Sequence, residues 1–101
     1  MSKNIILIGA GGLGKEVFGW FENDICDNTS IKGFLDKTDP NLSKFGIKSA
    51  YLGNECDYVF ENNDYAIITI SDIDIRNKIY SNLVNKVKFT NLIHSKAIIS
   101  N

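Results

Sequence analysis

Short runs of large aliphatic residues recur along the chain and predict buried strands. Residues 4–9 (Asn-Ile-Ile-Leu-Ile-Gly) and 65–70 (Tyr-Ala-Ile-Ile-Thr-Ile) are nearly continuous apolar runs. Such runs are typical of strands that are covered on both faces in a parallel sheet. Residues 31–36 (Ile-Lys-Gly-Phe-Leu-Asp) predict a further strand that ends in a carboxylate. Two more strands are expected over residues 47–52 and 89–93.

Between these runs, apolar residues recur at helical spacing. A first helix is expected from about residue 12 to residue 23. Its apolar residues are Leu13, Val17, Phe18, Trp20 and Phe21. A second helix is expected after residue 72, with one apolar stripe facing the sheet. That stripe consists of Ile75, Ile79 and Leu83. We also expect a short helix over residues 55–61, and Asp39-Pro40 predicts a loop over residues 37–46.

This alternation of strands and helices predicts an α/β fold. Parallel strands joined by right-handed helical crossovers give a small Rossmann-like sheet of four or five strands with flanking helices. The length of 101 residues allows one hydrophobic core and therefore one domain. A full nucleotide domain together with a separate substrate domain would not fit.

Charge and composition exclude several classes of function. The formal net charge is -1, from 11 basic and 12 acidic residues that are scattered along the chain, so nucleic acids and anionic membranes are not expected as partners. No apolar run approaches the roughly 20 residues that span a bilayer. The run at residues 5–8 is also too short for the core of a signal peptide, and we expect a cytoplasmic location.

The cysteines and the single histidine suggest no catalytic or metal chemistry. Cys26 and Cys56 match no zinc spacing and are expected to be reduced thiols, with a disulfide or redox pair as the alternative. His94 follows a strand, and no serine or cysteine is placed by sequence to pair with it, so we expect a structural or linker position. The sequence therefore predicts no catalytic residue and no metal ligand.

A glycine motif carries the strongest chemical signal. Residues 9–14 (Gly-Ala-Gly-Gly-Leu-Gly) fit G-x-G-x-x-G between a predicted strand and a predicted helix, the context in which the motif binds phosphates. Gly9 would allow the tight turn, Gly11 would let the backbone approach a phosphate, and Gly14 would let the helix pack on the strand. The first N–H groups of the helix would face the anion. The alternative is a tight turn with no ligand.

Polar residues at two other strand ends are candidates for the same site. Asp36 lies 22 residues after Gly14 (36 − 14 = 22), close to the spacing at which dinucleotide folds place an acid that binds a ribose. Ser71 and Asp72 follow the strand at 65–70, at the same carboxyl edge of the sheet. Their alternatives are a solvated carboxylate at position 36 and simple helix capping at positions 71 and 72.

Taken together, these residues show a family resemblance. The chain resembles the amino-terminal domain of bacterial sugar acetyltransferases of the PglD and NeuD type, the sialic acid O-acetyltransferases among them. The resemblance runs over nearly the whole length and rests on five segments in the family's order. These are residues 5–17 (Ile-Ile-Leu-Ile-Gly-Ala-Gly-Gly-Leu-Gly-Lys-Glu-Val), 33–36 (Gly-Phe-Leu-Asp), 51–53 (Tyr-Leu-Gly), 67–76, and 91–94 (Asn-Leu-Ile-His).

The resemblance implies one half of a two-part protein. In the family, a Rossmann-like domain holds a UDP-sugar, and a left-handed β-helix of hexapeptide repeats binds acetyl-CoA, forms the trimer and supplies the catalytic histidine. Here the implied nucleotide-sugar domain covers residues 1–94, and residues 95–101 resemble the start of a linker to a β-helix that is absent from this sequence. We therefore expect a UDP-sugar-binding domain for surface-glycan biosynthesis that is not catalytic by itself, with acetyl-CoA and a trimer belonging only to the full-length enzyme.

Carried over position by position, the resemblance assigns ligand contacts along one edge. Gly11, Gly12, Leu13 and Gly14 would line the phosphate or ribose, Asp36 would contact the nucleoside, and Ser71 and Asp72 would border the sugar. Two positions depart from the family pattern. Many members carry histidine or phenylalanine where Leu13 stands, and many carry Gly-Asp or Gly-Asn where Ser71-Asp72 stands. The Cβ of Ser71 would narrow the approach of the sugar.

Two other functions fit parts of the sequence. An NAD(H)-binding domain of a redox sensor or an oxidoreductase fragment would also use the glycine motif and Asp36, but the second half of the chain shows no second mononucleotide-binding unit. A ligand-free interaction domain would keep the glycine motif only as a turn.

Overall fold

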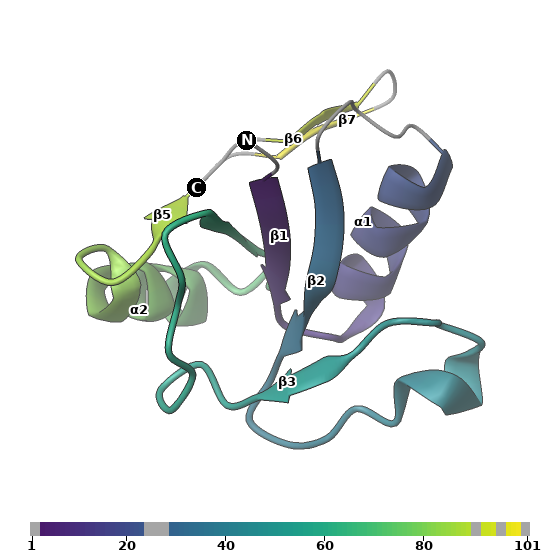
Figure 1. The fold of residues 1–101 in the computed structure, drawn as a ribbon, viewed down its shortest axis with the longest axis horizontal. Helices are drawn as coiled ribbons and strands as arrows, with labels where there is room; N and C mark the ends of the chain where they lie inside the picture. Colours follow the sequence, from purple (N-terminus) through teal and green to yellow (C-terminus); the bar gives the residue numbers. More distant parts are fainter. Residues whose placement is uncertain (1–2, 24–28, 90–91, 95–96, 100–101) are drawn as a thin grey trace.

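The computed structural model describes residues 3–23, 29–89, 92–94 and 97–99, with side chains over residues 4–19 and 31–89. Figure 1 shows the order of elements along the chain. In sequence they are β1 (Lys3–Ile8), α1 (Gly12–Asn23), β2 (Thr29–Leu35), the 3-10 helix η1 (Leu42–Phe45), β3 (Tyr51–Gly53), β4 (Asp64–Ile68), α2 (Ile73–Leu83), β5 (Lys88–Phe89), β6 (Leu92–His94) and β7 (Ala97–Ile99).

Five strands form one parallel sheet in the order β3-β2-β1-β4-β5. This confirms the predicted α/β fold with a small Rossmann-like sheet. The central strand β1 has β2 on one side and β4 on the other, and its last residue, Ile8, pairs with both Leu35 and Ile68. The carboxyl ends of these three strands therefore lie level, at the point where the strand order reverses.

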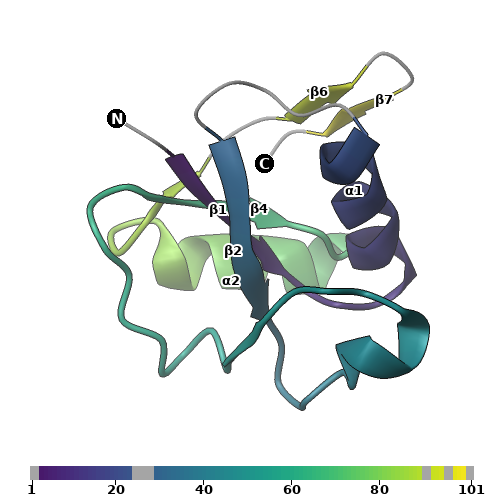
Figure 2. The same ribbon diagram turned by 45° about the vertical axis from the view of Figure 1, so that its right-hand side comes forward.

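The two helices cover opposite faces of the sheet (Figure 2). Alternate residues of β1 point to opposite faces, as strand geometry requires. Ile5 and Leu7 pack with Val17 and Phe18 of α1, and the remaining aliphatic residues of β1 pack in a second cluster. That second cluster contains Ile6, Ile8, Leu35, Ile79 and Leu83. Both faces of the sheet are thus buried, which explains the continuous apolar runs in the sequence.

The apolar stripe predicted for α2 is only partly buried. Ile79 and Leu83 are buried on the sheet, but Ile75, expected beside them, is 44% exposed. Ile75 lies in the first turn of α2. Trp20 and Phe21 fall outside the residues whose side chains are described.

The segment between β3 and β4 departs most from the sequence prediction. The strand expected over residues 47–52 is limited to Tyr51–Gly53, and residues 55–57 form a turn where a helix was expected. The cause is Asn54, whose side chain accepts a hydrogen bond from the Cys56 N–H at 2.8 Å. An asparagine that satisfies nearby N–H groups in this way favours a turn over a helix.

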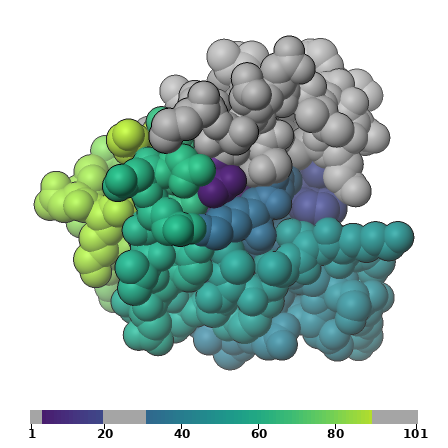
Figure 3. Space-filling view, in the orientation of Figure 1, coloured from purple at the N-terminus to yellow at the C-terminus, as the bar shows by residue number. Residues whose placement is uncertain are grey.

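This segment crosses the face of the sheet on which α2 lies. Tyr58 and Phe60 pack against the cluster that contains Ile79 and Leu83. In the space-filling view the teal-green residues between β3 and β4 lie at the front of the molecule, in the left and central part of the view (Figure 3).

The predicted strand over residues 89–93 is divided between two sheets. Lys88–Phe89 pairs with β4 as the edge strand β5, whereas Leu92–His94 pairs antiparallel with Ala97–Ile99 in a separate two-stranded sheet. The prediction that His94 is structural concerns a side chain outside the described residues, as does the redox state of Cys26. Cys56 is a free, exposed thiol.

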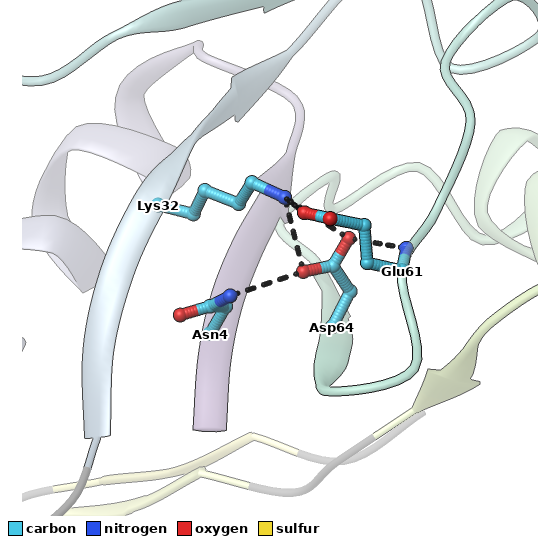
Figure 4. Close-up of polar contacts among 4 residues, drawn as sticks. All are labelled: Asn4, Lys32, Glu61 and Asp64. Carbon is cyan, nitrogen blue, oxygen red and sulfur yellow. Dashed lines mark hydrogen bonds and ion pairs between the residues drawn. The ribbon is translucent and has the colours of Figure 1, made fainter. Parts of the chain in front are cut away.

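A polar cluster occupies the amino end of the sheet (Figure 4). Asp64, whose side chain is fully buried, accepts hydrogen bonds from Lys32 Nζ at 3.2 and 3.3 Å, from the Glu61 N–H at 2.8 Å, and from Asn4 Nδ2 at 3.4 Å. Lys32 also contacts Glu61 Oε1 at 2.6 Å. Lys32 is the extra residue at a register shift in β2, between Ile31 and Gly33 in the pairing with β1. This bulge places its ammonium over Asp64 and joins three strands.

Within the residues described here, no helix has the length and apolar character needed to cross a membrane.

Candidate functional site

The tight turn after β1 depends on two glycines, as predicted. Gly9 has φ of +108°, and a Cβ there would lie 2.6 Å from Ile70 Cγ1. Gly14 lies in the first turn of α1, and a Cβ there would clash with the carbonyl oxygen of Gly9. Side chains at either position would therefore force the helix away from the strand. These two glycines have a structural role that does not depend on a ligand.

Gly11 and Gly12 differ from these two because the protein itself does not require them. Both are exposed, neither has a positive φ, and a Cβ at either position would meet no atom within 4 Å. They lie at the start of α1, where the first N–H groups of a helix have no partner within the helix. The absence of side chains leaves this backbone open to approach from outside.

Leu13, also expected to line the ligand, packs against the apolar cluster between α1 and the sheet. The neighbouring Gly14 is buried and Lys15 is half-buried, with Lys15 Nζ only 3.4 Å from the centroid of the Phe45 ring in η1. This cation–π contact fastens the segment between β2 and β3 to the first turn of α1.

Thr69 is a buried residue of the site that sequence reasoning did not single out. Its Oγ1 lies 2.6 Å from the carbonyl oxygen of Gly9 and 3.1 Å from that of Ile8, and its N–H donates to the same Ile8 oxygen at 2.9 Å. A hydroxyl among aliphatic residues at a strand end must find an acceptor, and that was the available signal. Thr69 holds the turn after β1 against the end of β4.

Asp36 lies in direct contact with the glycine turn. Its Oδ2 accepts a hydrogen bond from the Ala10 N–H at 2.9 Å, and its Oδ1 accepts one from the Lys37 N–H at 2.7 Å. The Tyr51 hydroxyl donates to the Asp36 carbonyl oxygen at 3.0 Å, and the Asp36 N–H donates to the Gly53 carbonyl. The spacing of 22 residues therefore does bring the acid and the glycine turn together.

Negative charge gathers around Tyr51. Burial raises the pKa of Tyr51, and the nearby carboxylates of Asp39, Asp36 and Glu55 raise it further. The hydroxyl therefore keeps its proton and its hydrogen bond to the Asp36 carbonyl through the neutral range.

Asp72 acts as the N-cap of α2. Its Oδ1 accepts hydrogen bonds from the Asp74 N–H at 3.0 Å and the Ile75 N–H at 3.1 Å. This is one of the two roles that the sequence allowed for it. Ser71, immediately before it, is exposed.

The predicted residues therefore gather at one edge of the sheet. The glycine turn follows β1, Asp36 follows β2, and Ser71 and Asp72 follow β4, and these three strands are neighbours with level ends. A reversal of strand order at this edge is where open α/β sheets place ligands. The arrangement offers N–H donors from α1 and carboxylate acceptors from the neighbouring strand ends. Across the described ranges, no three metal-ligating side chains are grouped together.

Comparison with known proteins assigns the family. A family model described as the PglD N-terminal domain matches residues 4–83, which run from the start of β1 to the end of α2 and include every residue of this edge. A search of curated proteins found no match to the chain. Because the match covers most of the 101 residues, the chain belongs to the PglD N-terminal domain family, the amino-terminal domains of sugar acetyltransferases.

Proposed function

We propose that this domain binds a UDP-sugar and presents it for acetylation by acetyl-CoA at the catalytic part of a bacterial sugar acetyltransferase. The observation that carries the proposal is the contact between Asp36 and the glycine turn, beside the exposed backbone of Gly11 and Gly12. In a member of this family, that contact joins an anion-binding helix start to an acceptor for nucleoside hydroxyls.

The diphosphate would bind at the start of α1. The open backbone at Gly11 and Gly12 allows phosphate oxygens to reach the first N–H groups of the helix. The positive end of the helix dipole favours the negative charge of the ligand there.

The ribose would bind to Asp36. Each carboxylate oxygen accepts one backbone N–H, which leaves further lone pairs for hydroxyl donors. Ser71 and Asp72 would border the sugar from the neighbouring strand end. Asp72 already holds two N–H groups of α2 through Oδ1, so its Oδ2 is the atom we assign to the sugar.

The domain would hold the acceptor without performing the transfer. Acetyl transfer needs a base and a site for acetyl-CoA. The resemblance assigns both to the β-helix, together with the trimer contact. We place the domain in the cytoplasm, with a role in the synthesis of surface-glycan sugars.

Calorimetric titration with UDP-N-acetylglucosamine, UDP and NAD tests this proposal. We expect the UDP compounds to bind and NAD to bind more weakly or not at all. Gly11→Val would block the backbone and weaken the binding of UDP by tenfold or more, on the order of the loss of one charge-assisted hydrogen bond. Gly19→Ala is the matched control, since a Cβ at Gly19 in the same helix also meets no atom within 4 Å.

The results separate the three functions that the sequence left open. Binding of NAD in preference to the UDP compounds would replace the proposal with a dinucleotide function. Binding of neither, with Gly11→Val folded and stable, would leave the glycine turn as a structural element only.

A further inference from the structure

An exposed apolar stripe runs along the outer flank of α2. Ile73 is 68% exposed, Val84 42% and Tyr80 39%. These side chains recur at helical spacing, with the exposed Asn77 between the first and the second, so that they share one side of the helix. We call these four residues the α2 stripe. The helix thus has a second apolar side besides the one that packs on the sheet, and such exposed patches mark interaction surfaces.

The α2 stripe is well prepared to receive side chains from a partner. A hollow of about 400 Å³ lies between the stripe and the end of β4, lined by Ile68, Ile73, Arg76, Asn77 and Tyr80. The ring of Tyr80 packs against that of Phe89, with the ring centroids 4.8 Å apart, which holds the tyrosine in place. An aromatic side chain that is already ordered loses little entropy when a partner packs on it, and tyrosine is enriched at the centres of interfaces.

The described end of the chain does not cover this stripe. In both ribbon views the β6–β7 hairpin lies beside α1 and not over α2 (Figure 1, Figure 2). The exposed fractions of Ile73, Tyr80 and Val84 agree with this arrangement.

The spacing of the α2 stripe is the same when it is followed from either end. Ile73 lies as many residues before the middle of the stripe as Val84 lies after it, and Asn77 and Tyr80 flank the middle equally. A second copy of α2 laid antiparallel on the stripe therefore pairs each Ile73 with the Val84 of the other copy. It also pairs each Asn77 with the Tyr80 of the other copy. A two-fold dimer requires a surface that is complementary to itself in this way.

The charges at the two ends of α2 favour the same antiparallel arrangement. Asp72 and Asp74 lie at its amino-terminal end, Lys86 and Lys88 follow its carboxyl-terminal end, and all four are exposed. An antiparallel copy brings an acidic end beside a basic end at both ends of the pair. A parallel copy would bring like charges together, which disfavours that alternative.

We propose that the α2 stripe is the interface of a two-fold dimer, in which α2 of a second copy of this chain packs antiparallel on it. Four side chains from each copy make an interface smaller than the standard size, so we expect a weak dimer with a Kd on the order of 100 µM. The proposal is independent of the proposed nucleotide function, because no residue of the stripe is assigned to the UDP-sugar.

Sedimentation velocity of the wild type, Ile73→Lys and Ile75→Lys, from about 10 µM to about 1 mM, tests the surface. We expect the wild type to dimerise as its concentration rises. Ile73→Lys should raise the Kd at least about tenfold, because the change removes both contacts between Ile73 and Val84. Ile75→Lys, on the other flank of the same helix, is the matched control and should leave the Kd unchanged.

Circular dichroism and thermal melting of the three proteins show that each is folded. A wild type that stays monomeric at about 1 mM would overturn the proposal. So would a dimer that Ile73→Lys leaves intact, or one that both substitutions weaken equally.

An exchange of charges tests the antiparallel direction at two exposed positions. Asp74→Lys places lysine against the basic end of the other copy, and Lys86→Glu places glutamate against its acidic end, so each variant alone should dimerise about tenfold more weakly. In an equimolar mixture of the two variants every end again faces an opposite charge. We therefore expect the mixture to regain the wild-type Kd. If the mixture dimerises as weakly as the single variants, the two helices are not antiparallel and the proposal is wrong.

Discussion

Two acidic residues lie near opposite ends of the same sheet, and they differ in the hydrogen-bond partners of their carboxylates. At the amino end, Asp64 has donors from Lys32, Asn4 and the backbone of Glu61. Beyond the carboxyl end of β3, the Glu55 residue is 7% exposed, but its carboxylate oxygens reach solvent and have no hydrogen bond among the described residues. The buried charge at the amino end therefore has partners within the protein, whereas the Glu55 carboxylate is hydrated by water.

The difference separates a side chain that holds the fold from one that contributes little to it. A buried charge with partners is strongly destabilising to disrupt, because the remaining partner is left buried and uncompensated. A carboxylate that reaches solvent and has no partner among the described residues adds little to stability, so its removal is expected to be tolerated. Substitutions at the two positions should consequently change the free energy of unfolding by very different amounts.

The largest effect is expected for Asp64→Ala. This change removes the acceptor of Lys32, Asn4 and the Glu61 N–H together, and we expect a loss of about 3 kcal/mol in the free energy of unfolding. Urea denaturation at neutral pH measures it, with the exposed Asp57→Ala as the matched control. A loss below about 1 kcal/mol would mean that the amino-end cluster does not hold the fold.

Thr69→Val tests whether the loss of stability depends on the hydrogen bonds of the replaced side chain or on the end of the sheet at which it lies. Thr69 lies at the carboxyl end like Glu55 but is hydrogen-bonded like Asp64. We expect a loss of about 1.5 kcal/mol, because the Gly9 carbonyl oxygen loses its buried donor. Thr38→Val, at an exposed threonine, serves as the control in the same denaturation series. A neutral or stabilising result would show that the end of the sheet, and not the hydrogen bonding of the side chain, determines how a substitution changes stability.

Glu55→Met should change stability only slightly. Methionine keeps the length of the side chain, and the carboxylate that it replaces reaches solvent without a partner among the described residues, so we expect a change within about 0.5 kcal/mol in the free energy of unfolding. Thermal denaturation measures it, beside the exposed control Glu16→Met. If Glu55→Met destabilises the protein as Asp64→Ala does, the two carboxylates are alike and the contrast between the ends disappears.

The smallest effect is expected for the contribution of Lys32 to stability at alkaline pH. Partial burial by itself lowers the pKa of Lys32, but hydrogen bonds to Glu61, Tyr58 and Asp64 outweigh it and raise the pKa above the usual 10.5. A raised lysine pKa adds stability that is complete below pH 10.5 and is lost as the pH rises through the folded-state value. The stability gap between the wild type and Lys32→Met should therefore shrink above pH 10.5.

Urea midpoints of the two proteins measured between pH 9 and about pH 11.5 test this window. Tyr51, whose pKa is also raised, is present in both chains, so its titration cancels in the difference. A gap that stays constant across the window would show that the Lys32 ammonium contributes nothing through its charge.

The sequence predicted the layers of the fold well because the burial of the strands dictates their composition. The runs at residues 4–9 and 65–70 correspond to the central strand β1 and its neighbour β4, and the first helix has the predicted bounds of Gly12–Asn23. These elements are specified by a periodicity that each segment carries by itself. The spacing between the glycine motif and Asp36 predicted their proximity in the same way, although their contacts with a ligand stay predictions.

The features that sequence reasoning missed are set by distant parts of the chain. Glu55 is buried because the turn after β3 lies against α2, which follows it by some twenty residues and contributes Ile79 and Leu83. The helix expected over residues 55–61 was wrong because the side chain of Asn54 forms a local turn instead. Thr69 appeared to be one more residue of a buried strand, since its acceptor belongs to the turn after β1.

The hydrogen bond from the Ala10 N–H to Asp36 has a consequence for the kinetics of ligand binding, because it orders the turn after β1 without a ligand. This bond forms within the protein alone, so the turn is preorganised before a nucleotide arrives. A ligand would then lose little affinity to the ordering of loops, which is a common cost of association. Encounter with the nucleotide should accordingly be rapid and follow a single kinetic phase, in contrast to the slower closure that a mobile phosphate-binding loop would impose.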